Sequence, residues 1–278
     1  MSDLRESFVT TSRGKRLAVT SSGSPDAEPV LLVHASGLSA AAWRRAVAHL
    51  SGSHQPIAID LLGYGRSDPA TRGAPAFASD DLEGITATLA SLGRPAHLVG
   101  HSYGGYLAAR AALSAPVASL LLIEPVLFGA LRTASDPEAA PELSLLYDDP
   151  AFLDDETGGS EAWMERFINY WSGEGAWATL PEAHRRANLR VAWKVYCEVR
   201  DLSGDPRPFS TYGALPAMTT LARGEHTTTC ARRIIDHLSQ ALPRAAVRTI
   251  AGAGHMWPLT HPDALRETLT CHLARAQR

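Results

Sequence analysis

A single serine occupies the centre of the most informative segment of this chain. Gly100-His101-Ser102-Tyr103-Gly104 follows an apolar run at residues 96–99 and precedes a helix-like stretch at 106–113. This pattern predicts a strand, a tight turn and a helix, with the serine held in a strained conformation that lifts its hydroxyl clear of the sheet. Glycine on either side lets the neighbouring backbone pass closely. Ser102 is therefore our candidate nucleophile.

A serine hydroxyl is a poor nucleophile near neutral pH and needs a base. His255, in the segment 252–258, would take the proton of Ser102 and then deliver it to the leaving group. A carboxylate must hold the imidazole in the right tautomer and stabilise its charged form. Two backbone amides must bind the oxyanion as it develops on the substrate. Ser102 and His255 together predict acyl-transfer chemistry.

Several carboxylates could serve as the acid of such a site. Glu124 directly follows residues 120–123, a run apolar enough to be a buried strand. A carboxylate there is costly unless it finds a positive or hydrogen-bonding partner, and His255 is the natural one. We therefore expect Glu124 to be the acid. The alternatives are Glu225, as second choice, and the more distant Asp201 or Asp205.

Short apolar runs alternate with amphipathic helical patterns along the chain. Most runs are continuously apolar, which is typical of strands covered by helices on both faces of a parallel sheet. The predicted strands are residues 16–21, 29–34, 55–60, 96–101, 119–124, 218–223 and 246–251. The predicted helices are residues 40–50, 80–92, 103–113, 230–241 and 262–276. This alternation predicts an α/β fold with a doubly wound, mostly parallel sheet.

The alternation of apolar runs and helices stops over residues 125–215, where no further strand is predicted. This segment holds 12 of the chain's 19 aromatic residues and two predicted helices, 161–170 and 181–199. We expect a helical cap here, inserted after the strand that ends at Glu124, with residues 1–124 and 216–278 forming the core. An insertion that leaves the sheet beside the nucleophile must hang over it, so some aromatic residues should line a pocket while others only pack. The predicted substrate-binding residues are Trp163, Phe167, Trp171 and, beside the histidine, Trp257.

Four segments in order resemble the α/β-hydrolase fold superfamily, in particular its capped serine hydrolases and esterases. They are His34-Ala35-Ser36-Gly37, the run from Asp60 to Ser67, the serine turn and the histidine loop. The resemblance covers nearly the whole chain. It implies that the backbone amides of Ser36 and Tyr103 form the oxyanion hole, and that His34 orders its loop. The family usually has His-Gly where this chain has His34-Ala35, so this loop departs slightly from the pattern.

The acid departs further from the commonest pattern of that superfamily. Many relatives carry a Gly-x-x-Asp turn where this chain reads Gly224-Glu225-His226-Thr227, and a threonine cannot act as the carboxylate. Some members of the fold, the haloalkane dehalogenases among them, place the acid after the strand that follows the nucleophile helix, where this chain has Glu124. A dehalogenase is disfavoured, because that chemistry uses an aspartate nucleophile and residue 102 is serine.

Composition restricts the possible partners. The chain has 278 residues, 45% of them hydrophobic, and a net charge of -3 with scattered Lys and Arg, so we expect no nucleic-acid partner and no membrane association. Without a signal-like N-terminus or an apolar stretch of membrane-spanning length, a cytoplasmic location is expected. Cys197, Cys230 and Cys271 lack close spacing, which favours reduced thiols. We expect a small-molecule substrate, no cofactor and no metal, and the oligomeric state stays open.

These patterns predict a cofactor-independent serine hydrolase that cleaves a carboxylic ester, lactone or related acyl compound through an acyl-enzyme. Two alternatives stay open. The same fold could hydrolyse a carbon–carbon bond or catalyse a lyase or cyclase reaction, since one scaffold hosts many activities. The aromatic cap could also belong to a binding module without catalysis.

Overall fold

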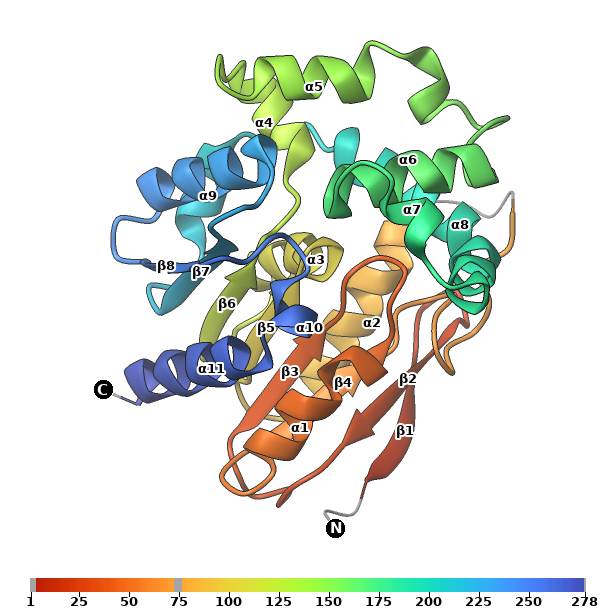
Figure 1. The fold of residues 1–278 in the computed structure, drawn as a ribbon. Coiled ribbons are helices and arrows are strands. Elements are labelled where there is room, and N and C mark those ends of the chain that lie inside the picture. The colour runs from red at the N-terminus through yellow and green to blue at the C-terminus, as the bar shows by residue number, and fades with distance from the viewer. Residues whose placement is uncertain (1–3, 73–76, 278) are drawn as a thin grey trace.

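The computed structural model describes residues 4–72 and 77–277, and its centre is an eight-stranded sheet (Figure 1). The strands are β1 (Arg5–Thr10), β2 (Arg16–Ser21), β3 (Pro29–Val33), β4 (Gln55–Ile59), β5 (His97–His101), β6 (Ser119–Ile123), β7 (Thr219–Gly224) and β8 (Ala246–Ile250). Their order in the sheet is β1-β2-β4-β3-β5-β6-β7-β8. β2 pairs with β1 and β4 in antiparallel fashion, and the remaining pairs are parallel. The predicted doubly wound, mostly parallel sheet is confirmed.

Each predicted strand matches an observed one to within one residue at either end. The predictions run one residue too far at His34, Asp60, Glu124 and Ala251, which come directly after β3, β4, β6 and β8. The edge strand β1 was not predicted. Its residues are almost all exposed, so it carries no apolar run for a sequence pattern to detect.

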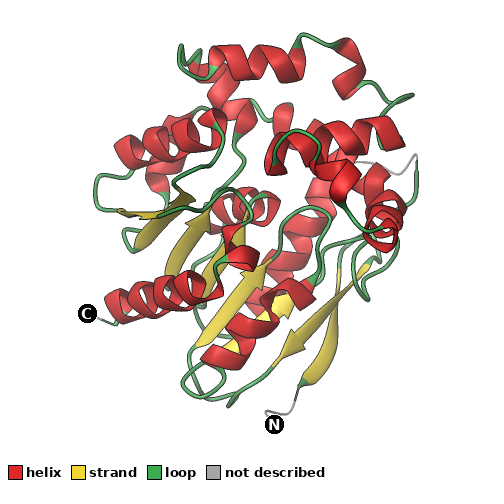
Figure 2. Ribbon diagram, viewed as in Figure 1, coloured by secondary structure: helices red, strands yellow, loops and turns green. Residues whose placement is uncertain are grey.

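Helices cover both faces of the sheet (Figure 2). Alternate strand residues separate into two apolar clusters, because successive side chains of a strand point to opposite faces. Leu31 and Val33 belong to the cluster under α2, α3 and α9, whereas Val30 and Leu32 belong to the one under α1 and α11. The covering elements are η1 (Ala40–Trp43), α1 (Arg44–Leu50), α2 (Phe77–Ser91), α3 (Tyr103–Ala112), α9 (Thr229–Ala241), α10 (Trp257–Thr260) and α11 (Pro262–Ala276). The predicted helix 40–50 is thus a 3₁₀ turn followed by an α-helix.

Between β6 and β7 the chain forms only helices, which lie beyond the carboxyl ends of the parallel strands in Figure 1. They are α4 (Phe128–Ala134), α5 (Ala140–Tyr147), η2 (Pro150–Leu153), α6 (Glu161–Ser172), α7 (Ala176–Thr179), α8 (Glu182–Ser203) and η3 (Phe209–Ala214). We call residues 125–215 the insertion. The two helices predicted there correspond to α6 and α8, and both run a few residues further than expected.

Two carboxylates of the insertion form hydrogen bonds with α9. Asp136 accepts hydrogen bonds from Arg233 and His237, and Arg233 holds the pKa of this carboxyl well below its usual range. Glu142 accepts from the backbone N–H groups of Thr229 and Cys230, at 2.8 and 3.1 Å. Free N–H groups at a helix N-terminus favour such an anion. The insertion is therefore attached to the core by defined polar contacts as well as by apolar packing.

Among the described residues, no helix combines the length and the apolar character needed to cross a membrane.

Candidate active site

Ser102 lies in the tight turn between β5 and α3. Its backbone has φ 55° and ψ -118°, a conformation that is strained for a residue with a side chain. The turn needs the glycines around it: a Cβ at Gly100 would lie 2.2 Å from the carbonyl oxygen of Gly104, and one at Gly104 would lie 2.3 Å from that of Val33. The predicted strand, turn and helix are all present.

Ser102, His255 and Glu124 form one chain of hydrogen bonds. The Nε2 atom of His255 lies 3.0 Å from the Ser102 hydroxyl oxygen, and its Nδ1 atom lies 2.8 Å from Glu124 Oε2. All three residues are buried. With Nδ1–H donating to the carboxylate, Nε2 keeps a lone pair and can accept the serine proton. This is the geometry of a serine nucleophile with its base and orienting acid.

The sheet brings these residues together. Because β5 and β6 are parallel and His101 is in register with Ile123, Ser102 and Glu124 leave neighbouring strands at the same edge. Ser102 N–H donates to the Ile123 carbonyl oxygen, at 2.9 Å. Glu124 also has positive φ, 47°, which is uncommon for a residue with a side chain. Two strained non-glycine residues thus lie side by side at the sheet edge.

Glu124 is held by three donors. Burial alone would raise its pKa, but hydrogen bonds from His255, the Gly224 N–H (2.6 Å) and the Thr227 hydroxyl outweigh burial, and the net shift of its pKa is downward. Thr227 does not replace the missing aspartate of the family's common pattern. It instead donates a hydrogen bond to the carboxylate that lies on the neighbouring strand.

The other carboxylates considered as the acid lie elsewhere. Glu225 is exposed, and its carboxylate accepts from the Gly252 N–H at 2.7 Å. Asp201 accepts from the Ala78 N–H. Asp205 accepts from the Tyr106 hydroxyl and from Arg207. The observed contacts of His255 therefore favour Glu124 over Glu225.

The loop after β3 carries Ser36, and hydrogen bonds of His34 and Tyr64 fix the conformation of this loop. His34 accepts a hydrogen bond from the Leu61 N–H through Nε2, at 3.0 Å, and its Nδ1 atom faces the Ala35 carbonyl at 2.8 Å. The Tyr64 hydroxyl accepts from the Gly37 N–H. His34 thus orders the loop through its contacts with Ala35 and Leu61. Ser36 lines the cavity over Ser102, and Tyr103 begins α3.

An apolar cavity of about 450 Å³, mouth included, opens on Ser102 beneath the insertion. Phe167 and Trp171, both predicted to bind substrate, line it. The remaining lining residues are Ser36, Val126, Phe128, Leu146, Tyr147, Phe152, Tyr170, Val199 and Leu202.

Trp163 and Trp257 lie away from this lining. Trp163 is buried between the rings of Phe152 and Phe167, and its Nε1–H donates to the Phe152 carbonyl at 2.9 Å. Trp257 is buried in the apolar cluster under α1 and α11. Periodicity placed Trp163 on the right face of α6 but could not show how deep it lies. The positions of Trp163 and Trp257 do not support the predicted contact of either residue with the substrate.

Trp171 also covers the imidazole of His255. Its ring stacks on the imidazole of His255, with centroids 3.8 Å apart and planes inclined by 22°. Beneath, His101 Nε2 lies 3.1 Å from the His255 carbonyl oxygen, and burial lowers the pKa of His101 to about 3. His101 is therefore neutral and can donate this bond. The insertion and the core together fix the plane of the imidazole.

A buried charge cluster formed by Lys194, Asp81 and Glu198 was not predicted from the sequence. Lys194 Nζ, on α8, lies 2.5 Å from Asp81 Oδ2 and 2.9 Å from Glu198 Oε1. Asp81 also accepts from the Tyr103 hydroxyl and the Leu62 N–H. The i,i+4 spacing of Lys194 and Glu198 is a weak signal, because most such pairs lie on the surface.

The chain matches the Alpha/beta hydrolase family over residues 30–268. It is 26% identical over 259 residues to a 2-hydroxy-6-oxononadienedioate/2-hydroxy-6-oxononatrienedioate hydrolase of Paraburkholderia phymatum, covering 87% of this chain and 85% of that one. It is 35% identical over 126 residues to the abhydrolase domain-containing protein abhd-5.2 of Caenorhabditis elegans, which is 42% of this chain and 26% of the relative. The chain thus spans about a quarter of the length of that second relative.

Solved structures show the same fold. The carboxylesterase CesB from Bacillus subtilis superimposes with a TM-score of 0.70 at 22% identity, over 98% of this chain and 92% of that one. The match over residues 30–268 covers most of the chain, and the sheet, the serine turn and the histidine loop agree with it. The chain therefore belongs to the alpha/beta hydrolase family.

Proposed function

We propose that this protein is a serine hydrolase that cleaves a carboxylic ester, lactone or related acyl compound through an acyl-enzyme. One observation carries the proposal: the continuous hydrogen-bond chain from Ser102 through His255 to Glu124, with distances of 3.0 and 2.8 Å, opens on an apolar cavity. A protein that only binds a ligand needs neither this chain nor the strained backbone that presents the serine.

In the first step, Ser102 Oγ attacks the substrate carbonyl while its proton moves to His255 Nε2. Negative charge develops on the carbonyl oxygen. The backbone N–H groups of Ser36 and Tyr103 are the donors assigned to it, an interaction whose loss typically costs about 3 kcal/mol in the barrier. Glu124 stabilises the imidazolium that forms, and its lowered pKa keeps it ionised at neutral pH.

In the second step, the tetrahedral intermediate collapses. The bond to the alkoxy oxygen breaks, His255 donates its proton to that oxygen, and the acyl group remains on Ser102. Water then enters, His255 takes a proton from it, and the hydroxide attacks the acyl-enzyme. The second tetrahedral intermediate collapses, the bond to Ser102 Oγ breaks, and His255 returns its proton to that oxygen. For an ester, the products are an alcohol, a carboxylic acid and the free enzyme. A lactone follows the same course and yields a hydroxy acid.

The cavity lining restricts the substrate. Most of the lining side chains are aliphatic or aromatic, and among the described residues that line it none is Lys or Arg. Such a cavity favours an uncharged, largely apolar acyl or alcohol group. We therefore propose esters or lactones of small hydrophobic acids as the substrate class.

Carbon–carbon bond hydrolysis is the second candidate, and the relative from Paraburkholderia phymatum favours it because the match covers most of both chains. The name of that enzyme denotes a dicarboxylate substrate. A dicarboxylate would need cationic or strongly donating groups in the cavity, and the apolar lining around Ser102 offers few. The cavity lining thus favours hydrolysis of an uncharged ester over carbon–carbon bond hydrolysis of a dicarboxylate.

The test is a substrate panel measured as kcat/KM. Uncharged esters and lactones with acyl groups of increasing length are compared with vinylogous diketones that carry zero, one or two carboxylates. We expect turnover of uncharged esters or lactones, abolished in Ser102→Ala and retained in Glu225→Gln. Preferred turnover of a carboxylate-bearing diketone would assign the protein to carbon–carbon hydrolysis, and unchanged ester turnover in Ser102→Ala would exclude the serine mechanism.

A further inference from the structure

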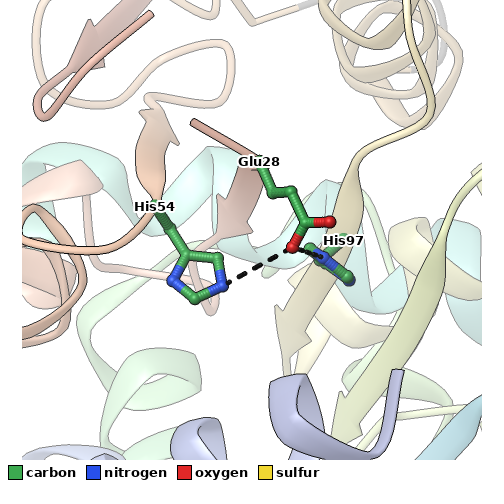
Figure 3. Close-up of side chains that lie close together, drawn as sticks. All are labelled: Glu28, His54 and His97. Carbon is green, nitrogen blue, oxygen red and sulfur yellow. Dashed lines mark ion pairs between the residues drawn. The ribbon is translucent and has the colours of Figure 1, made fainter. Parts of the chain in front are cut away.

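Two histidines and a glutamate lie close together (Figure 3). They are at the amino ends of parallel strands, whereas Ser102 follows the carboxyl end of β5. Glu28 directly precedes β3, His54 directly precedes β4, and His97 is the first residue of β5. These three strands are neighbours, in the order β4-β3-β5, and run parallel. Their amino ends therefore bring the three side chains together, although no local sequence motif connects them.

The three side chains converge on one point. The Glu28 Oε2 atom lies 3.6 Å from His97 Nε2 and 4.0 Å from His54 Nε2, and the ligand atoms of all three residues lie within 4.8 Å of one another. Ligands of a tetrahedral zinc ion, each about 2.0–2.1 Å from the metal, are separated by about 3.3 Å. Because Glu28 is about half exposed, rotation of its side chain can shorten the distances from its carboxylate to the two imidazole nitrogens.

The far nitrogen of each imidazole has a hydroxyl partner. His54 Nδ1 lies 2.8 Å from Ser53 Oγ, and His97 Nδ1 lies 2.7 Å from Ser119 Oγ. Metal-binding histidines nearly always donate their other ring N–H to a carboxylate, a backbone carbonyl or a water, which fixes the tautomer and the ring orientation. A serine hydroxyl oxygen can accept the same hydrogen bond. The tautomer in which both Nδ1 atoms donate leaves both Nε2 lone pairs directed toward Glu28.

The Nε2 atom of His54 makes no hydrogen bond in the described structure, and His54 is 8% exposed. A buried polar atom without a partner costs free energy, so it requires an explanation. Its nearest charged neighbour, Glu28 Oε2 at 4.0 Å, is too far for a hydrogen bond. A cation between the two atoms would satisfy both of them.

The loop that carries Glu28 is also held in place. Arg94 donates to the carbonyl oxygens of Pro25, Asp26 and Ala27, which directly precede Glu28. Glu28 accepts a weak hydrogen bond from Gln277 Nε2, at 3.3 Å, and its Oε2 atom faces His97 Nε2 at 3.6 Å. The backbone is thus ordered while the carboxylate keeps acceptor capacity.

We propose that Glu28, His54 and His97 form a zinc site, with water in the fourth position on the solvent side of Glu28. Two imidazoles and one carboxylate are a ligand set that zinc accepts readily. The site connects the amino ends of the neighbouring strands β4, β3 and β5. Ser102 lies beyond the carboxyl end of β5, at the opposite end of these strands. Its role is to stabilise the sheet, and the hydrolytic chemistry at Ser102 does not use it.

The test uses untagged full-length protein stripped with a chelator and titrated with Zn²⁺ against a chromophoric competitor. We expect one zinc ion per chain and a higher midpoint of thermal unfolding when zinc is bound. Co²⁺ in place of zinc should give the intense visible absorption of a tetrahedral site. Ester hydrolysis by Ser102 reports whether each variant is folded.

Three variants decide the assignment. Glu28→Gln changes a half-exposed side chain, so it preserves the fold, and it should weaken zinc binding at least as much as the loss of an outer partner does, about 10–100-fold. His54→Gln should abolish stoichiometric binding and the thermal shift. The control, His184→Gln, changes an exposed histidine on α8 and should bind like the wild type. The proposal is overturned if the stripped wild type binds no zinc, or if Glu28→Gln and His54→Gln bind as tightly as the control.

Discussion

The carboxyl edge of the sheet and the insertion that lies over it contribute different kinds of side chain to one cavity. The sheet edge supplies Ser102, Glu124 and His255, which are joined by hydrogen bonds, and the backbones of Ser102 and Glu124 have positive φ. The insertion supplies aromatic and aliphatic rings, among them Phe167 and Trp171. The contrast suggests that the core determines whether the reaction occurs, and the insertion determines which substrate undergoes it.

The two regions are also coupled. Lys194 on α8 of the insertion forms ion pairs with Asp81 on α2 of the core, and Trp171 stacks on His255. Substitutions at these contacts should therefore affect both regions. Those deep in either region should affect only one.

The largest effect is expected at Glu124. Glu124→Gln keeps the shape of the side chain but removes the charge that orients His255, so kcat should fall by about 10⁴-fold, as in other triads that lose the acid. Steady-state kinetics on the best ester measure this effect. The matched variant Glu225→Gln, at an exposed carboxylate, should lose little activity. If Glu225→Gln is crippled and Glu124→Gln is nearly normal, the assignment of the acid is reversed.

The next largest effect is expected where the two regions meet. Lys194→Met would leave Asp81 and Glu198 buried without their cation, and breaking a buried pair in this way costs about 3–5 kcal/mol of unfolding free energy. Urea unfolding measures the loss. Arg186→Met, which removes the exposed ion pair with Glu182 on the same helix, should cost less than about 1 kcal/mol. Equal losses of unfolding free energy in the two variants would mean that the buried cluster stabilises the protein no more than the exposed ion pair does.

Two tryptophans of α6 separate packing from selectivity. Trp171→Ala opens the cavity and should change the ratio of kcat/KM for long and short acyl groups, whereas Trp163→Ala should mainly lower the unfolding free energy, by about 3 kcal/mol. An acyl-length series and urea unfolding of both variants provide the two measurements. If Trp163→Ala changes the preference more than Trp171→Ala does, the described cavity is not the substrate site.

The smallest expected effect is on the unfolding free energy at acidic pH. Burial lowers the pKa of His272 to about 3, while an unfolded histidine titrates near 6.5. Between these values the unfolded state binds more protons, so the unfolding free energy falls as the pH falls. His272→Gln removes one such group, and the decrease between about pH 6.5 and 5 should become smaller by about 1–2 kcal/mol. A variant whose decrease with pH equals that of the wild type would contradict this account.

Local patterns were sufficient for the core. The parallel strands are short apolar runs that a sequence shows directly, and the serine turn is fixed by Gly100 and Gly104 within the same segment. Glu124 could be named because a carboxylate directly after a buried strand needs a partner. At these positions, the residues within a few places along the chain are enough to predict the local structure.

The remaining features depend on contacts between distant segments. Lys194 and Asp81 are 113 residues apart, and no periodicity reveals that α8 packs there. Trp163 and Trp171 share one face of α6, yet one is enclosed by aromatic rings and the other reaches His255. α4 and α5 were missed because they are short and their sequences carry weak patterns. That the insertion closes over the site as a cap stays a prediction.

The central claim is that Ser102 carries the acyl group, and covalent labelling tests it most directly. The protein is treated with an activated alkyl phosphonate, and intact mass, peptide mapping and residual ester hydrolysis are followed together. We expect one phosphonyl group per chain, located on Ser102, with activity lost in proportion to labelling and no labelling in Ser102→Ala. Inactivation with the adduct on another residue, or the same labelling in Ser102→Ala, would contradict the account.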